Sequence, residues 1–188
     1  MFRLLAMAAL SWFIFAFILL HIVRTDLTLW HTTLSIYAVG PADWVLTIGF
    51  YAIALVQGMI ACHGIEQRHS WRDYVVSGLL LLAALGAVLV AVFPYTIKLP
   101  HNTGAVLQLG LFPISLSLRT VWFRERSLRK TNTLLAVISM SCFLLLLLAN
   151  PMRNLPFYSF GFIQKLEIIC ITLWLLCYSA VAFKRAGE

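Results

Sequence analysis

Six long apolar runs, separated by short polar segments, dominate the sequence. Each run approaches the roughly 20 apolar residues that an α-helix needs to cross the ~30 Å hydrocarbon core of a bilayer. The runs lie at about residues 4–23, 45–62, 75–94, 103–118, 133–150 and 162–183. The short connections leave no room for a soluble domain. The pattern therefore predicts an all-α fold, a polytopic transmembrane bundle of six helices that forms a single domain over residues 1–188.

Composition supports a membrane protein. Hydrophobic residues make up 62% of the chain and charged residues only 11%, whereas soluble domains carry about 25% charged residues. The first run begins three residues into the sequence and is not followed by a small-residue cleavage site, so we expect a retained helix rather than a cleaved signal.

The distribution of Lys and Arg predicts an orientation. If the N-terminus lies inside, ten basic residues fall on the inner side and four on the outer side. The outer four are Arg24, Lys98, Arg153 and Lys165. Because short cytoplasmic loops are enriched in Lys and Arg, both termini are expected to be cytoplasmic. The net charge of +7 reflects this bias, and we expect no nucleic-acid partner.

The segment FPYTIKLPHN, residues 93–102, separates the third and fourth runs and ends in His101 and Asn102. Proline disfavours helix in the residue before it, so we expect the fourth helix to begin after Pro100, with Asn102 or Thr103 as its cap. A neutral imidazole at this position can accept a proton, bind a metal or hydrogen-bond a lipid headgroup. The alternative is an interfacial ring bonded to a nearby loop carbonyl.

The sixth run opens with three polar residues, Gln164, Lys165 and Glu167. An ionisable side chain inside a span is costly and faces protein or water rather than lipid. Glu167 is therefore expected to belong to a polar site or to pair with Lys165, Arg153 or Arg24.

The long connection at residues 24–44 is apolar but contains Ser35, Tyr37 and Asp43. Asp43 can cap the second helix, and the leucines of the connection, Leu34 among them, are expected to hold it at the membrane surface. Topology places all the polar residues discussed above on one membrane face. The predicted ligand-binding set is His101, Asn102, Glu167, Lys165, Gln164, Asp43, Ser35 and Tyr37.

Metal and cofactor chemistry is not indicated. The four cysteines lie within or at the ends of spans without CxxC spacing, so free thiols are expected. His63, Glu66 and His69 recur at steps of three, but the third position has rotated off the shared helix face. No GxSxG or HExxH motif is present, and no catalytic residue is assigned.

Three stretches carry a family resemblance: LSIYAVGPADW at 34–44, AVFPYTIKLPHN at 91–102 and GFIQKLEI…LW at 161–174. Together they resemble the bacterial membrane-protein family called domain of unknown function 998. The resemblance implies a helical unit of the bacterial inner membrane with an outward cluster around the FP…HN segment, and it implies no activity. Asp43 departs from the family pattern, in which a second glycine is common. The chain is also distantly similar to six-span membrane proteins of the Frag1/DRAM/Sfk1 type.

The favoured function is an outward-facing polar site for a lipid headgroup or a small polar ligand, with membrane lipids as partners. A membrane-embedded lipid-modifying enzyme is an alternative, with His101 or Glu167 as acid or base and Ser35 as a candidate nucleophile. A small transporter or channel subunit that uses Gln108, and an assembly partner without chemistry of its own, are further alternatives. A haem held by His21 and His101 is the last alternative.

Overall fold

The computed structural model describes residues 1–40, 42–66, 70–123, 128–148 and 159–185. Within these ranges the regular structure is helical. The helices are α1 (Phe2–Val23), α2 (Leu34–Tyr37), α3 (Asp43–Glu66), α4 (Trp71–Val92), α5 (Lys98–Trp122), α6 (Arg129–Leu147) and α8 (Phe160–Arg185).

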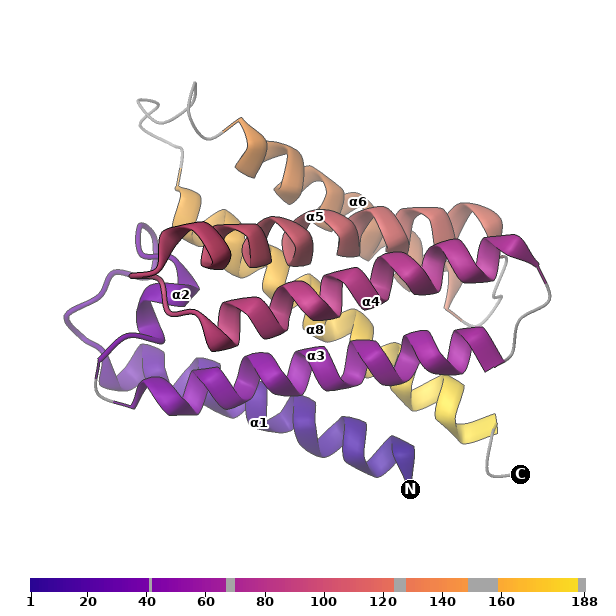
Figure 1. Ribbon diagram of the computed structural model, residues 1–188, viewed down its shortest axis with the longest axis horizontal. Helices are drawn as coiled ribbons and strands as arrows, with labels where there is room; N and C mark the ends of the chain where they lie inside the picture. Colours follow the sequence, from indigo (N-terminus) through magenta and orange to yellow (C-terminus); the bar gives the residue numbers. More distant parts are fainter. Residues whose placement is uncertain (41, 67–69, 124–127, 149–158, 186–188) are drawn as a thin grey trace.

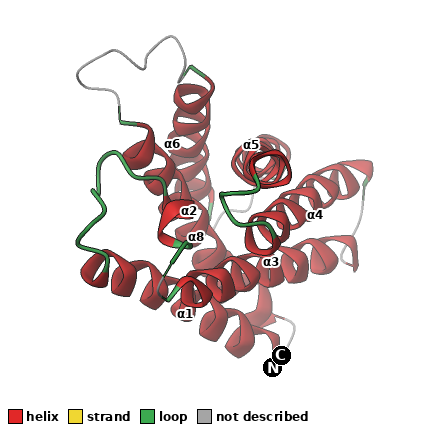
Figure 2. Cartoon of the chain, turned by 60° about the vertical axis from the view of Figure 1, so that its left-hand side comes forward, coloured by secondary structure: helices red, strands yellow, loops and turns green. Residues whose placement is uncertain are grey.

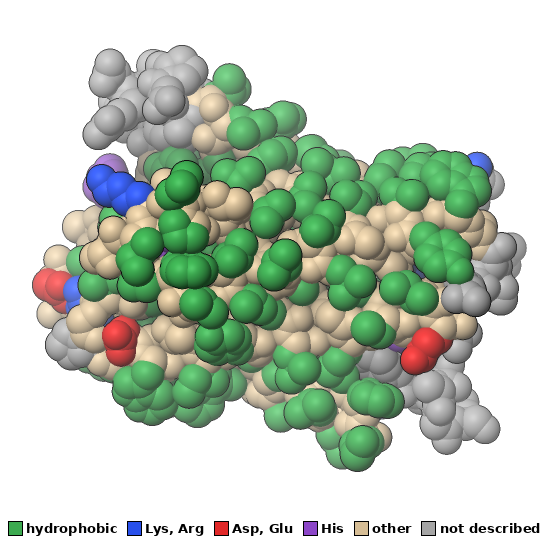
Figure 3. Space-filling model, in the orientation of Figure 1, with side chains coloured by type: hydrophobic (Ala, Val, Ile, Leu, Met, Phe, Trp, Pro, Cys, Tyr) green, Lys and Arg blue, Asp and Glu red, His purple; other side chains and the backbone are tan. Residues whose placement is uncertain are grey.

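Six of these helices are long and apolar enough to cross a membrane, and α2 is a single short turn. On the face drawn in Figure 3, hydrophobic side chains cover the length of the bundle, and charged side chains lie towards its two ends. This distribution is typical of a protein that spans a bilayer. The predicted all-α bundle of six membrane-spanning helices is confirmed.

The two ends of the bundle differ in what they carry. In Figure 1, α1 begins and α8 ends at the same end, while α2 and the start of α8 lie at the opposite end. We call the end that carries α2 and the start of α8 the α2 end. The chain segments that follow α1 and α4 also lie there, so the FPYTIKLPHN segment and the start of α8 share one end of the bundle.

The start of α5 differs from the sequence prediction. The helix was expected to cover 103–118 and to begin after Pro100, but it begins at Lys98 and includes Pro100 in its first turn. This is physically permitted, because the first N–H groups of a helix have no partner within it and proline lacks only that N–H. Asn102 and Thr103 are therefore inside α5 rather than at its cap.

Helices α4 and α5 approach closely through two glycines. A Cβ atom on Gly86 would lie 2.6 Å from the Gly104 carbonyl oxygen, and one on Gly104 would lie 2.7 Å from the Gly86 carbonyl oxygen. Hydrophobic burial cannot drive helix association inside a bilayer, because lipid is as apolar as the helix surface. Close backbone packing through small residues supplies the attraction instead.

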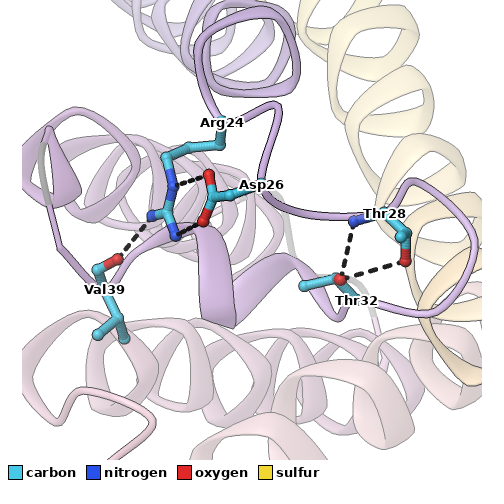
Figure 4. Close-up of polar contacts among 5 residues, drawn as sticks. All are labelled: Arg24, Asp26, Thr28, Thr32 and Val39. Atoms are coloured by element: carbon cyan, nitrogen blue, oxygen red, sulfur yellow. Dashed lines mark hydrogen bonds and ion pairs between the residues drawn. The ribbon is translucent and has the colours of Figure 1, made fainter.

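Arg24 fixes the segment of residues 24–40, which follows α1. Its guanidinium pairs with Asp26 at 2.8 Å and donates a hydrogen bond of 2.7 Å to the Val39 carbonyl, so both ends of the segment are joined (Figure 4). The hydrogen bond from Arg24 lowers the pKa of the Asp26 carboxyl. The expectation that Leu34 lies at the membrane surface is wrong, because the segment turns inward there and Leu34 is 1% exposed.

Candidate functional site

Lys165 anchors the 24–40 segment to α8. Its ammonium donates hydrogen bonds of 2.7 Å to the Leu29 carbonyl and of 2.7 Å to the Thr32 carbonyl, and the side chain is 2% exposed. It also lies 4.9 Å from the centre of the Tyr37 ring, within the distance at which a cation is attracted to an aromatic face. The charge of Lys165 is therefore satisfied within the protein.

Tyr37 lies between Lys165 and His21. We call these three side chains the buried layer. The Tyr37 and His21 rings stack with centroids 4.4 Å apart, and Tyr37 is 1% exposed. His21 Nδ1 lies 2.6 Å from the Phe17 carbonyl oxygen, and a carbonyl only accepts, so Nδ1 carries the proton. Burial raises the pKa of the Tyr37 hydroxyl.

Gln164 and Ser35 form the edge of the same layer. Gln164 Oε1 accepts a hydrogen bond of 2.9 Å from the Leu34 N–H, which fixes α2 against the start of α8. Figures 1 and 2 both show α2 beside the beginning of α8. Ser35 Oγ lies 3.3 Å from Thr33 Oγ1. The hydrogen bond to Leu34 uses the amide oxygen of Gln164 and leaves its amide nitrogen as a potential donor.

A groove of about 470 Å³ opens beside this layer, between α5, α6 and the start of α8. Its volume is in the range of small-molecule sites, about 300–1,000 Å³. Its polar lining residues, which we call the polar wall, are Thr33, Ser35, Tyr95, His101, Asn102 and Gln164. Its apolar lining residues, which we call the apolar wall and which come from α5, α6 and α8, are Ala105, Val106, Leu109, Phe143, Leu146, Leu147 and Phe160. We call the whole groove the α5–α6 groove.

A small cavity of about 30 Å³ adjoins the groove. Ser35, His101 and Gln164 line both spaces, and Gln108 is an additional polar residue that lines only the cavity. Both amide atoms of Gln108 are buried and have no hydrogen-bond partner among the described residues. The cavity has room for about one or two water-sized groups.

His101 is one of the residues that line both the groove and the cavity. Its Nδ1 lies 2.8 Å from the Phe93 carbonyl oxygen and is therefore the donor, and its ring meets the edge of Tyr95 with centroids 5.7 Å apart. This hydrogen bond agrees with the alternative interpretation of His101 as a ring bonded to a nearby loop carbonyl. In the neutral ring Nε2 is then a hydrogen-bond acceptor, and the ring lines both spaces.

Comparison with known proteins gives a family. A family model described as Protein of unknown function (DUF998) matches residues 7–181. The chain belongs to the DUF998 family. The match covers all six membrane-spanning helices and confirms the resemblance seen in the three sequence stretches. No curated protein and no solved structure matches the chain.

Glu167 of this DUF998 protein is buried apart from the groove. It is 0% exposed, and neither carboxyl oxygen has a hydrogen-bond partner among the described residues. The described residues contain no ion pair from Glu167 to Lys165 or Arg24, and Arg153 lies outside them. Glu167 interacts electrostatically with the thiols of Cys142 on α6 and Cys170 on α8, which places it where those two helices meet.

Four of the eight sequence-predicted residues line the groove: Ser35, His101, Asn102 and Gln164. Tyr37 and Lys165 belong to the buried layer beside it. Asp43 is exposed and is the first residue of α3 rather than its cap. Its Oδ1 accepts a hydrogen bond of 2.6 Å from the N–H of the adjacent Trp44, whereas a capping side chain bonds the N–H two or three residues further on.

Sequence reasoning missed two polar residues of the groove, Thr33 and Tyr95, and all of the apolar residues that α6 contributes to it. Tyr95 lies within the FPYTIKLPHN segment, so its position near His101 was a usable signal. The groove-lining leucines of α6 gave no signal, because they resemble the leucines that face lipid. Among the described residues, no three His, Cys, Asp or Glu side chains lie close enough together to hold a metal ion.

Proposed function

We propose that this DUF998 protein binds a membrane lipid in the α5–α6 groove, with the headgroup at the polar wall and an acyl chain against α6. The observation that carries the proposal is that the groove is lined both by polar residues and by apolar residues of helices long and apolar enough to span a membrane. A lipid is the amphipathic molecule that surrounds such a groove at high concentration.

The apolar wall accommodates the acyl chain of the lipid but supplies only a small part of the binding free energy. It includes Leu146 and Phe143 of α6 and Val106 of α5. A chain that moves from the bilayer into the groove exchanges one apolar environment for another, so burial of its methylene groups gives little free energy. Discrimination among lipids must then come from hydrogen bonds to the headgroup at the polar wall.

The polar wall offers several hydrogen-bonding groups at one level of the bundle. Nε2 of His101 accepts, the Gln164 amide nitrogen donates, and the Asn102 amide can do both. Tyr95 and the hydroxyls of Thr33 and Ser35 extend the wall. The Lys and Arg count favours cytoplasmic termini, and in that orientation the polar wall lies at the outer leaflet of the membrane. In a bacterium this membrane would be the cytoplasmic (inner) membrane.

Native mass spectrometry of the purified protein tests lipid binding. Leu146→Trp places an indole in the groove and is expected to abolish lipid adducts that survive detergent purification. Leu144→Trp is the matched control, because Leu144 lies on the same helix, is 51% exposed and does not line the groove. Equal lipid retention by the two variants contradicts the proposal.

A further inference from the structure

The groove and the cavity are lined without formal charge. None of the described side chains that line either space is Lys, Arg, Asp or Glu. Among the described residues, two nearby cations are engaged elsewhere: Lys165 binds two backbone carbonyls and Arg24 pairs with Asp26. Lys98 is exposed and lines neither space. Phosphate binding normally relies on Arg or Lys and on charge-assisted hydrogen bonds.

A hydroxyl is a more versatile partner for His101 than a phosphate. The ring nitrogen left free by the bond to Phe93 is an acceptor in the neutral imidazole. Ionised phosphate oxygens only accept, so a phosphate can pair with this nitrogen only when the ring is the imidazolium and donates from it. A hydroxyl group both donates and accepts, and it can pair with this nitrogen, with an amide or with another hydroxyl. The wall therefore suits hydroxyl groups better than anionic oxygens.

Gln108 adds a second, independent observation. Its side chain is 4% exposed and lines the cavity, yet its amide oxygen and nitrogen have no partner among the described residues. A buried polar group without a partner is costly, and a ligand hydroxyl supplies both a donor and an acceptor to an amide. The cavity volume of about 30 Å³ admits a hydroxymethyl group and excludes a whole sugar ring.

From these contacts we infer that the bound lipid has an uncharged, hydroxyl-bearing headgroup, such as a sugar. The headgroup lies along the polar wall of the groove and directs one hydroxymethyl group past His101 into the cavity, where it hydrogen-bonds Gln108. This inference rests on lipid binding in the groove, as proposed above, and adds the chemical class of the headgroup.

A competition between lipids with identical chains tests the inference. The delipidated protein is mixed with equal amounts of monoglucosyl-dioleoylglycerol, dioleoylglycerol and dioleoylphosphatidylglycerol, and the adducts are counted by native mass spectrometry. We expect the glucosyl lipid to exceed phosphatidylglycerol by about tenfold or more, because the described lining residues offer a buried phosphate no Lys or Arg. Excess free glucose is expected not to displace the glucosyl lipid, and displacement would overturn the assignment to a lipid headgroup.

Two glutamine variants provide a matched pair. Gln108→Leu is expected to lower the ratio of glucosyl lipid to dioleoylglycerol by about tenfold, the loss that one or two buried hydrogen bonds produce. Gln57→Leu is the control, because Gln57 is 0% exposed and equally without partners but lines neither space. Its ratio should equal that of the wild type. If Gln108→Leu does not fold, Ser35→Ala serves in its place and must lower the same ratio.

The outcomes separate the two proposals. If phosphatidylglycerol binds as well as the glucosyl lipid, or if Gln108→Leu keeps the wild-type ratio, the inference about the headgroup is wrong while lipid binding stands. If none of the three lipids binds, or if Leu146→Trp retains them all, lipid binding in the groove is itself wrong.

Discussion

Replacing Gly104 with alanine introduces a methyl group into the contact between α4 and α5. The new Cβ would lie 2.7 Å from the Gly86 carbonyl oxygen, 2.7 Å from Leu89 Cβ and 3.0 Å from the Val90 backbone nitrogen. Two of these are backbone atoms and one is the first carbon of a side chain, so none can rotate away. The helices must separate by roughly 0.7 Å to restore ordinary contact.

The magnitude follows from two opposing effects. Overpacking of a well-packed interior costs about 1–3 kcal/mol, and an unyielding backbone contact belongs at the upper end of that range. Alanine is intrinsically better than glycine in a helix by about 1 kcal/mol. We therefore expect Gly104→Ala to lower the free energy of unfolding by about 1–2 kcal/mol. Because α5 also carries His101 and Gln108, the shift should reduce lipid retention as well.

Reversible unfolding in mixed detergent measures the effect, with Gly78→Ala as the control. Gly78 lies on α4, and a Cβ there meets no atom within 4 Å. This control should be neutral or up to about 1 kcal/mol more stable than the wild type. If Gly104→Ala proves as stable as Gly78→Ala, α4 and α5 are not packed through their glycines and the reasoning is refuted.

Three further predictions concern the α2 end of the bundle. Lys165→Met leaves two backbone carbonyls without a donor and should lower the free energy of unfolding by about 2–4 kcal/mol. The control Lys98→Met, at an exposed position, should change it by less than about 0.5 kcal/mol. Equal changes of the two variants in thermal unfolding would refute the role assigned to Lys165. Because the pKa of Asp26 is lowered, its ion pair stabilises the fold above the ordinary carboxyl pKa of about 4 and loses this effect as pH falls through the folded-state pKa. Asp26→Asn should therefore melt below the wild type at about pH 6 and together with it at about pH 2, and a gap that persists in acid contradicts the assignment. In a chain without native cysteines, Thr96→Cys should react with impermeant maleimide added to intact cells and Lys130→Cys should not; the reverse labelling overturns the proposed orientation.

Much of the fold could be predicted from the sequence, because membrane spans are set by length and hydropathy over about 20 residues. The start of α5 could not, because the first turn of a helix tolerates a proline and nothing in the sequence marks Pro100 as belonging to that turn. This error also misplaced Asn102 as a helix cap; Asn102 lies within α5 and lines the groove.

The site was predictable only in part. Residues near one end of the bundle were identified from topology, but the partners of Lys165 are backbone carbonyls, which a sequence does not reveal. Glu167 is two positions from Lys165, and two helical positions differ in direction by about 200°, so the two side chains leave α8 on different sides. Leu144 and Leu146 are alike in sequence, although one is exposed and the other lines the groove.

Photocrosslinking tests lipid binding in the groove most directly. A lipid with a diazirine in its acyl chain is exchanged into the purified protein and illuminated, and the modified residues are mapped by mass spectrometry. Lipid bound as proposed should label Phe143, Leu146 and Leu109, which line the groove, well above the exposed residues Leu144 and Val137. Labelling spread evenly over exposed and groove residues would contradict the central claim.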